Sequence, residues 1–282
     1  MKVILTGGSG FLGSYAVKEL LAGGVDVINV DSKAPAERLC PWYNADLENL
    51  GEVASLLAMH APDAVVHLAA IPNPLLTAEN VTFRVNVMST YNVFYAASVL
   101  GIKKIAFAST DSSYGRVFAK RAFLPEYLPM DEKHPQRPQD AYGGSKLMCE
   151  QIAKMHTDGH GMQAVALRFS LVAHPDIYVN YPKNTHAVMM DPDRIANCFS
   201  YVDVRDAARA CLKAVQLDGH GFEAVHITAD ETSMDVPTME IVRRCFPGVP
   251  SAEIAGYGAL YTNAAAKGLL GWAPQIRWRE QL

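Results

Sequence analysis

Short apolar segments alternate with longer amphipathic segments through the first 170 residues of the chain. The short segments are apolar on both faces, which is typical of parallel strands that lie between two layers of helices. We predict strands at residues 3–6, 25–30, 64–68, 104–108 and 164–169, and helices at residues 11–22, 50–59, about 79–100 and 142–156. This alternation predicts an α/β fold of the Rossmann type, in which helices cover both faces of a doubly wound parallel sheet.

The chain changes character after residue 170, where prolines become frequent and the predicted elements become shorter. We predict a helix over 202–215 with Asp203 as a candidate N-cap, a strand over 223–228 and a helix over 237–245. Residues 1–170 are therefore expected to form a dinucleotide-binding domain. Residues 171–282 are expected to form a small substrate-binding lobe, partly interleaved with that domain, above the carboxyl ends of the strands.

Composition narrows the classes of partner. The formal net charge of −4 argues against a broad surface for nucleic acid or for anionic membranes. No apolar run reaches the roughly eighteen residues that a membrane span needs, and residues 2–6 already form a predicted strand, so we expect no signal peptide. The five cysteines are scattered without a Cys-x-x-Cys pair, which predicts reduced thiols rather than a metal site. We expect a cytoplasmic protein that acts on a small molecule and holds no metal.

A glycine-rich turn, Thr6-Gly7-Gly8-Ser9-Gly10-Phe11-Leu12-Gly13, joins the first predicted strand to the first predicted helix. Gly7 and Gly10 allow the backbone to turn tightly and to approach a pyrophosphate. Gly13 allows the helix to pack closely against the strand, and the helix N-terminus supplies free N–H groups. A strand, this turn and a helix in succession predict a dinucleotide site.

Acidic residues after the second predicted strand are candidates for the adenosine end of that site. A carboxylate at Asp31 accepts both ribose hydroxyls and repels a 2′-phosphate, which predicts NAD rather than NADP, although Lys33 lies close enough to weaken the preference. The alternative for Asp31 is that it caps a turn. Asp46 and Leu47 are candidates for the adenine edge, and the alternative for Asp46 is that it caps the helix predicted to begin near residue 50.

Tyr142 and Lys146 lie four residues apart in Tyr-Gly-Gly-Ser-Lys, which places them on one face of a predicted helix. A lysine near a phenol stabilises the phenolate and lowers the tyrosine pKa, so that the phenol can take or return a hydroxyl proton. A hydroxyl at the carboxyl end of the fourth predicted strand, from Ser109 or Thr110, would align the reacting oxygen. The alternative is that these small polar residues only cap a turn.

Together these motifs resemble those of the extended short-chain dehydrogenase/reductases, also called the NAD-dependent epimerase/dehydratase family. The glycine-rich turn resembles the family's Thr-Gly-x-x-Gly-x-x-Gly, and the predicted catalytic helix resembles its Tyr-Gly-x-Ser-Lys-x-x-x-Glu, with Glu150 as the last residue. The resemblance covers nearly the whole chain. Its other matching segments are residues 66–70, Asn86 with Thr90 and Asn92, residues 201–206 and residues 269–274.

The resemblance implies an NAD-dependent oxidoreductase in which Tyr142 is the acid/base, Lys146 modulates it and Thr110 contacts the reacting oxygen. It implies that NAD is lined by Gly7, Gly10, Phe11, Leu12, Gly13, Asp31, Ser32, Asp46, Leu47, Leu68, Ala69, Ala70, Asn86, Ala108, Ser109, Tyr142, Lys146 and Phe169. The candidate substrate-binding residues are Asn73, Thr110, Asp111, Ser112, Ser170 and Arg194.

Two departures from the family pattern bear on the substrate. The fifth predicted strand ends at Ser170, where nucleotide-sugar members typically carry an asparagine, and only residues 171–200 fill a lobe that is longer in those members. Apart from histidines, the cations in that segment are Lys183 and Arg194, which leaves few contacts for a nucleoside diphosphate. The short lobe resembles that of uronate dehydrogenases, whose carboxylate-binding arginine lies close to the place of Arg194. The alternative for Arg194 is a solvated surface side chain.

That subgroup carries an asparagine where this chain has Asp111, so we widen the predicted substrate to a free sugar, a sugar acid or a similar polyol that undergoes Tyr/Lys/Thr-assisted hydride transfer. One alternative is 4-epimerisation of a nucleotide sugar with tightly bound NAD, or dehydration, for which Thr110-Asp111 is a partial match. A lesser alternative is a non-catalytic NAD-sensing regulator, which the intact Tyr142–Lys146 pair disfavours.

The predicted helix over residues 86–100 is apolar around much of its circumference, which indicates burial on more than one side. In the resembling family this helix and the Tyr-Lys helix form a four-helix interface across a two-fold axis. We therefore expect a homodimer.

Overall fold

A parallel sheet of seven strands forms the centre of the molecule, in a computed structural model that describes residues 1–181 and 191–282. The strands are β1 (Lys2–Thr6), β2 (Asp26–Val30), β3 (Trp42–Tyr43), β4 (Ala64–His67), β5 (Lys104–Thr110), β6 (Gln163–Phe169) and β9 (Phe222–Ile227). Their order across the sheet is β3-β2-β1-β4-β5-β6-β9, and every neighbouring pair is parallel. The predicted doubly wound parallel sheet is confirmed.

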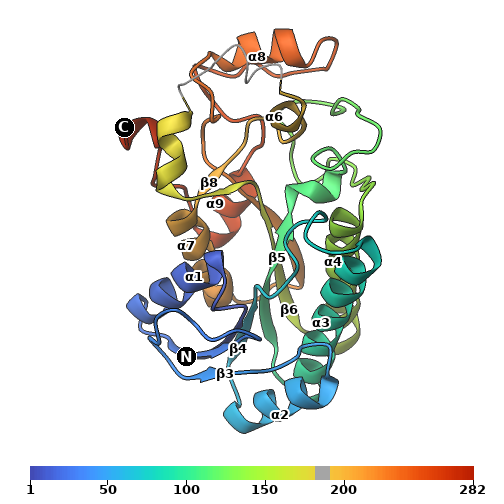
Figure 1. The fold of residues 1–282 in the computed structure, drawn as a ribbon, viewed down its shortest axis with the longest axis vertical. Coiled ribbons are helices and arrows are strands. Elements are labelled where there is room, and N and C mark those ends of the chain that lie inside the picture. Colours follow the sequence, from blue (N-terminus) through green and yellow to red (C-terminus); the bar gives the residue numbers. More distant parts are fainter. Residues whose placement is uncertain (182–190) are drawn as a thin grey trace.

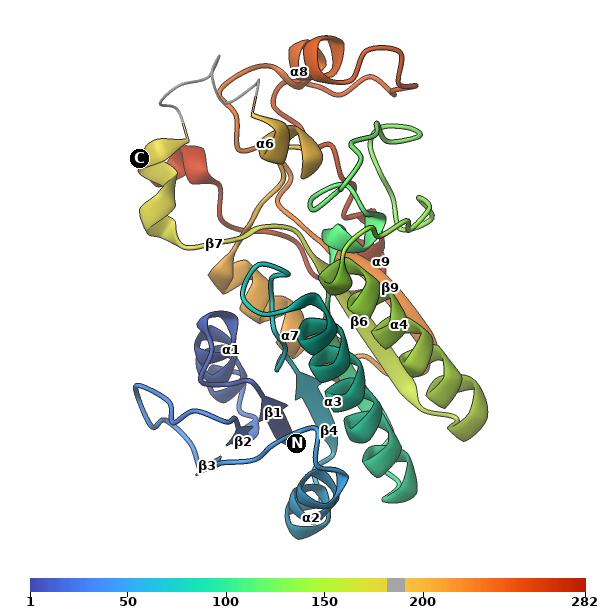
Figure 2. The ribbon, with the colours of Figure 1, turned by 45° about the vertical axis from the view of Figure 1, so that its right-hand side comes forward.

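Helices cover both faces of this sheet (Figures 1 and 2). One layer contains α1 (Phe11–Ala22) and α7 (Val204–Gln216), which pack against each other, and the other contains α2 (Leu50–His60), α3 (Glu79–Val99) and α4 (Ala141–His160). Successive strand residues point to opposite faces of the sheet. Val3 and Leu5 belong to the core under α1, whereas Ile4 and Val65 belong to the core under α3. The strands are apolar on both faces because both faces are buried.

The predicted elements agree closely with the observed ones, and α1 has the predicted bounds. Asp203 is the N-cap of α7, with its side chain accepting a hydrogen bond from Arg205 N, as predicted. The helix nevertheless begins at residue 204, because Val202 and Asp203 form β8 (Val202–Asp203), which pairs with β7 (Val172–Ala173) in a separate two-stranded sheet. That pairing joins residues thirty positions apart, so no local pattern indicates it.

A lobe lies beyond the carboxyl ends of the strands (Figure 1). It contains α6 (Pro192–Ala196), α8 (Thr238–Cys245) and the connection from η1 (Asp111–Tyr114) to α4, which share one apolar cluster. The C-terminal residues return through α9 (Ala264–Leu270) to the body of the protein, where Leu270 joins the core under α1. The lobe is therefore built from both halves of the chain. In the described part of the chain, no helix combines the length and the apolar character that a membrane crossing requires.

Candidate active site

The turn between β1 and α1 is a close-fitting cradle. Gly7 has a φ of +80°, and a Cβ placed there would lie 2.6 Å from Ala69 N, so a side chain is excluded both by conformation and by space. A Cβ at Gly13 would overlap the carbonyl oxygen of Gly7. The N-cap residue Gly10 has no side chain that could cap α1, and the first turn of the helix carries no acidic residue. The backbone N–H groups of this first turn are therefore available to an anion. The cradle fits the pyrophosphate of a dinucleotide.

Asp31 fastens this cradle to the end of β2. Its Oδ2 accepts a hydrogen bond from Ser9 N and its Oδ1 accepts one from Lys33 N, each at 3.0 Å. The carboxylate therefore caps its own turn, as the alternative predicted. Each carboxylate oxygen can still accept a further hydrogen bond, so the same side chain fits the ribose hydroxyls as well.

Asp46 and Leu47 take different positions at the edge of the sheet. The N-cap of α2 is Asn49, whose side chain accepts hydrogen bonds from Gly51 N and Glu52 N. The predicted alternative that Asp46 caps this helix is therefore wrong, because Asn49 is one residue from the first turn whereas Asp46 accepts from Glu48 N within the preceding turn. Asp46 is exposed.

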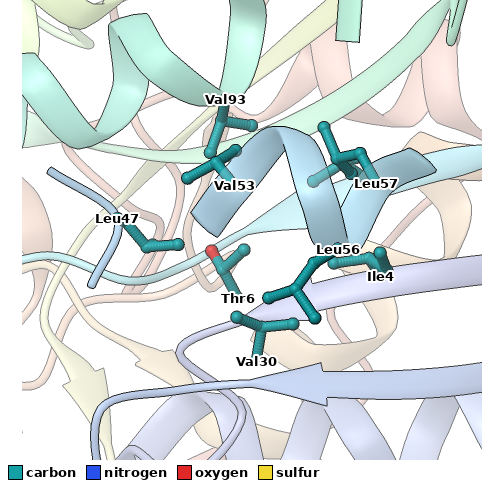
Figure 3. A pocket seen from close by; sticks show the side chains of 9 residues that line it. Ile4, Thr6, Val30, Leu47, Val53, Leu56, Leu57 and Val93 are labelled. Carbon is teal, nitrogen blue, oxygen red and sulfur yellow. The ribbon is translucent and has the colours of Figure 1, made fainter. Parts of the chain in front are cut away.

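Leu47 points inward and lines a narrow apolar pocket under α2, which it shares with Thr6 and Val30 (Figure 3). The free volume of this pocket is about 10 Å³, roughly the space of one water molecule. The Leu47 side chain therefore packs against the core under α2.

A buried amide joins the segment after β4 to the two neighbouring helices. The Asn86 side chain accepts a hydrogen bond from Ile71 N (2.8 Å) and donates to Ile71 O (3.0 Å) and to Ser145 Oγ (3.0 Å). Ser145 in turn donates to the Tyr142 carbonyl at 2.7 Å. The predicted cofactor residues Leu68, Ala69 and Ala70 precede this fixed loop and are half-buried. Sequence reasoning missed the linking role of Ser145, although the residue lies inside the quoted Tyr-Gly-Gly-Ser-Lys motif.

The three predicted catalytic residues meet where β5 ends beside α4. Tyr142 and Lys146 are buried on the same face of α4, whose N-cap Asp140 accepts from Gly143 N. Burial raises the pKa of the Tyr142 phenol above its ordinary value, whereas a hydrogen bond with the Thr110 hydroxyl lowers it. Burial also lowers the pKa of Lys146, whose ammonium donates to Ala108 O at 2.9 Å. A phenol, a hydroxyl and an ammonium are therefore assembled for proton transfer to a bound alcohol or carbonyl.

Asp111 adds a carboxyl group next to Thr110. The Thr110 hydroxyl lies 3.3 Å from Asp111 Oδ1 and 3.2 Å from Ser112 Oγ. Asp111 Oδ2 is buried and has no hydrogen-bond partner in the part of the chain that the structure describes. Burial raises the pKa of Asp111 to about 7. This carboxyl can accept a hydrogen bond from a ligand hydroxyl or, when protonated, donate one.

Several other predicted site residues use their side chains elsewhere. Ser109 faces α4 and donates to Glu150 Oε1 at 2.5 Å. Asn73 Oδ1 accepts from Leu75 N (2.7 Å) within its own loop, and the Ser170 hydroxyl donates weakly to Ile227 O (3.4 Å). Arg194 lies on α6, half-buried, with its guanidinium carbon 5.6 Å from the centre of the Tyr181 ring. The other cation predicted for the lobe, Lys183, lies outside the described residues.

The remaining predicted cofactor residues differ in their surroundings. Phe11, at the start of α1, is about half exposed and lies next to Tyr15 and His174. Leu12 packs against the core under α1, where Phe169 is buried and Ala108 is half-buried. The Ser32 carbonyl accepts a hydrogen bond from Asn44.

Comparison with known proteins adds four findings. Residues 3–227 match the family model described as the NAD dependent epimerase/dehydratase family. The chain is 27% identical, over an alignment 325 positions long, to a UDP-glucose 4-epimerase of Lacticaseibacillus casei, covering 97% of this chain and 92% of that protein. Among solved structures it is similar to a short-chain dehydrogenase/reductase superfamily protein of Agrobacterium tumefaciens with bound NAD, with a TM-score of 0.76, 22% identity and coverage of 100% and 95%. It is also similar to UDP-glucose 4-epimerase of Thermotoga maritima with UDP-glucose, with a TM-score of 0.73, 21% identity and coverage of 100% and 96%.

Proposed function

Because the chain belongs to the NAD-dependent epimerase/dehydratase family, we propose that Tyr142, Lys146 and Thr110 form the proton-transfer centre of an enzyme that reversibly oxidises a hydroxyl-bearing carbon of a sugar. The observation that carries the proposal is that Tyr142, Lys146 and Thr110 are all buried where β5 ends beside α4, with Lys146 Nζ donating to the carbonyl of Ala108 at 2.9 Å. The glycine cradle and Asp31 complete the site, because they fit the pyrophosphate and the ribose of NAD.

The residues of this chain supply binding, orientation and proton transfer, whereas bound NAD would supply the hydride acceptor. Thr110 orients the substrate oxygen toward Tyr142, which takes the hydroxyl proton during oxidation and returns it during reduction. Burial raises the pKa of Tyr142, so ionisation of the phenol needs positive charge beside it. We propose that Lys146, one helical turn away, supplies that charge.

For the overall reaction we propose 4-epimerisation of a nucleotide sugar, in which the same carbon is oxidised and then reduced without net release of NADH. The names of the relatives support this reaction, because the L. casei protein and the T. maritima structure are both UDP-glucose 4-epimerases. They favour it over the net oxidation of a free sugar that the sequence predicts.

A second candidate is that net oxidation, and the cations of the lobe favour it. A diphosphate is normally bound by free arginine or lysine side chains. Arg116 is buried and donates instead to Cys198 Sγ and to backbone carbonyls, and Arg279 pairs with Glu231. Arg194, whose guanidinium lies over Tyr181, has no carboxylate partner among the described residues, so a single anionic group such as a uronate carboxylate suits it better than a diphosphate.

One experiment separates the two reactions. Purified protein with NAD is given UDP- and TDP-sugars in one panel, and free aldoses and uronic acids in the other, with NADH followed by absorbance and products by NMR. Epimerisation predicts a changed nucleotide sugar without accumulated NADH. Accumulation of NADH with a free sugar would replace it by the second candidate. Tyr142→Phe should abolish either reaction and still bind NAD, whereas a non-catalytic sensor would be indifferent to this change.

We also propose a homodimer, in which α3 and α4 pair with the same helices of a second copy. Large apolar side chains on the outer surfaces of these helices are exposed in the single chain, which is unusual for a contiguous surface. They are Phe83, Met88, Tyr91, Tyr95, Met148 and Met155. Light scattering should give twice the chain mass, and a monomer at micromolar concentration would contradict the proposal.

For localisation we propose the cytoplasm. The five cysteines are free thiols, and Cys149, Cys198, Cys211 and Cys245 are buried, which fits a reducing compartment. Cell fractionation would test this, and recovery in an oxidising compartment would contradict it.

A further inference from the structure

A buried ion pair lies directly behind the proposed catalytic group. Glu150 and Arg168 are 1% and 5% exposed, and the guanidinium donates to both carboxylate oxygens, from Nε to Oε1 at 2.9 Å and from an Nη to Oε2 at 2.7 Å. Glu150 Oε1 also accepts from Ser109 Oγ (2.5 Å), and Oε2 accepts from Gln136 Nε2 (3.2 Å). This buried carboxylate therefore accepts from four donors, two of which belong to one bidentate arginine, so its hydrogen-bonding capacity is well satisfied.

This pair continues as a chain of hydrogen bonds into the lobe. Arg168 donates to Tyr114 Oη at 2.9 Å, and Tyr114 Oη lies 2.5 Å from His226 Nε2. His226 Nδ1 lies 3.0 Å from Thr262 O. Because a carbonyl can only accept, Nδ1 carries the proton and Nε2 accepts from the tyrosine. This chain of hydrogen bonds links β6, β9 and the lobe to α4.

The contact between Ser109 and Glu150 determines how α4 sits on β5. Glu150 lies four residues beyond Lys146 and eight beyond Tyr142, so all three point from the same face of α4. Ser109 lies between the two β5 residues that contact the catalytic side chains. The carbonyl before it accepts from Lys146, and the hydroxyl of Thr110 after it lowers the pKa of the Tyr142 phenol. Three successive strand residues therefore meet three successive turns of one helix.

We propose that Ser109 and Glu150 are positioning residues, which hold α4 in register on the end of β5 and so set the contact between Tyr142 and Thr110; this rests on the proposed function. Neither side chain reaches the crevice, because both are buried and their hydrogen bonds are directed to each other and to Arg168 and Gln136. Ser109, which the sequence places in the cofactor or oxygen-binding group, acts through the helix instead.

The alternative is that this network only stabilises the fold, and the phenol of Tyr142 distinguishes the two. The Thr110 hydrogen bond lowers the pKa of that phenol, so a displaced helix should raise the pKa. A purely structural network would lower the stability and leave the pKa unchanged.

The test uses the full chain with saturating NAD and tyrosine labelled with ¹³C at Cζ. The Tyr142 signal is identified by its loss in Tyr142→Phe and then titrated with pH. Ser109→Ala should raise the pKa of this phenol by about one unit and lower the turnover about tenfold, while the KM of the sugar and the Kd of NAD change less than twofold. Ser109→Thr retains the hydroxyl and should restore the wild-type titration.

Thr157→Val is the matched control, because it removes another buried hydroxyl of α4 that donates only to Lys154 O among the described residues. It should leave the titration unchanged. An unaltered pKa in Ser109→Ala, or equal shifts in Ser109→Ala and Thr157→Val, would overturn the proposal. Failure of the proposed function would look different, because the wild type would then turn over no sugar while the titration, which needs no substrate, still reports on the helix.

Discussion

Replacing Asp111 with asparagine should change the difference in unfolding free energy between variant and wild type in favour of the variant as the pH rises from 5 to 8. Asp111 is only 6% exposed, and burial raises its pKa from the ordinary value of 3.8 to about 7. The folded state therefore holds a proton that the unfolded chain releases near pH 4. This contribution to stability is fully present below pH 3.8 and is lost as the pH rises to about 7.

The size of the effect follows from the two pKa values. About two pKa units separate pH 5 from the folded pKa, and each unit corresponds to about 1.4 kcal/mol. The wild type should therefore lose about 3 kcal/mol of unfolding free energy relative to Asp111→Asn between pH 5 and pH 8. Asparagine has nearly the same shape and does not titrate, so any cost that is independent of pH cancels in this difference.

Urea unfolding at both pH values measures the effect, with Asp193→Asn as the control because Asp193 is exposed and has no ion-pair partner among the described residues. The control should show no comparable change with pH. A difference below about 1 kcal/mol for Asp111→Asn would refute the reasoning, since it would mean that the folded protein ionises this carboxyl almost as readily as the unfolded chain.

Three further predictions concern the cradle and the C-terminal segment. Gly13→Ala should abolish NAD binding in calorimetry, because the added Cβ overlaps the backbone of Gly7 and Gly8. Gly159→Ala on α4 is the control, because its Cβ meets open space. This variant should still bind NAD and should be more stable by up to about 1 kcal/mol. Asp31→Ser should raise the Kd of NAD about tenfold and reduce the preference for NAD over NADP. An unchanged Kd would mean that this carboxylate only caps its turn. Asp206→Ala should cost about 3 kcal/mol in urea unfolding, because this buried carboxylate accepts two C-terminal backbone N–H groups, and a loss below about 1 kcal/mol would contradict that role.

The parts of the site that depend on local spacing could be predicted from the sequence. A glycine turn between a strand and a helix, and a tyrosine and a lysine four residues apart, define their own geometry within a few residues. The direction of Ser109 was also within reach, because side chains alternate along a strand and Ser109 must point away from Thr110. The choice between neighbouring N-cap candidates could not be predicted from the sequence. Asp46 and Asn49 are both good N-cap residues, and only the position at which α2 begins decides between them.

Long-range contacts explain what the sequence could not reveal. Tyr114 lies 112 residues from His226 and 54 from Arg168, so no periodic pattern links them. The burial of Arg116 against Cys198 is similar, because a guanidinium enclosed by carbonyls and a thiol has the same sequence signature as a solvated one. Such groups are recognised only when the fold brings their partners together.

The place of β9 in the sheet has a consequence for biosynthesis. β6 ends at Phe169, but its outer neighbour begins only at Phe222, so the ribosome must add about fifty residues before that edge can be paired. At roughly 5–20 residues per second the nascent sheet presents an open, apolar edge for about 3–10 seconds. During that interval the open edge of β6 can pair with strands of other chains. The protein would therefore benefit most from a chaperone while the ribosome adds residues 170–221.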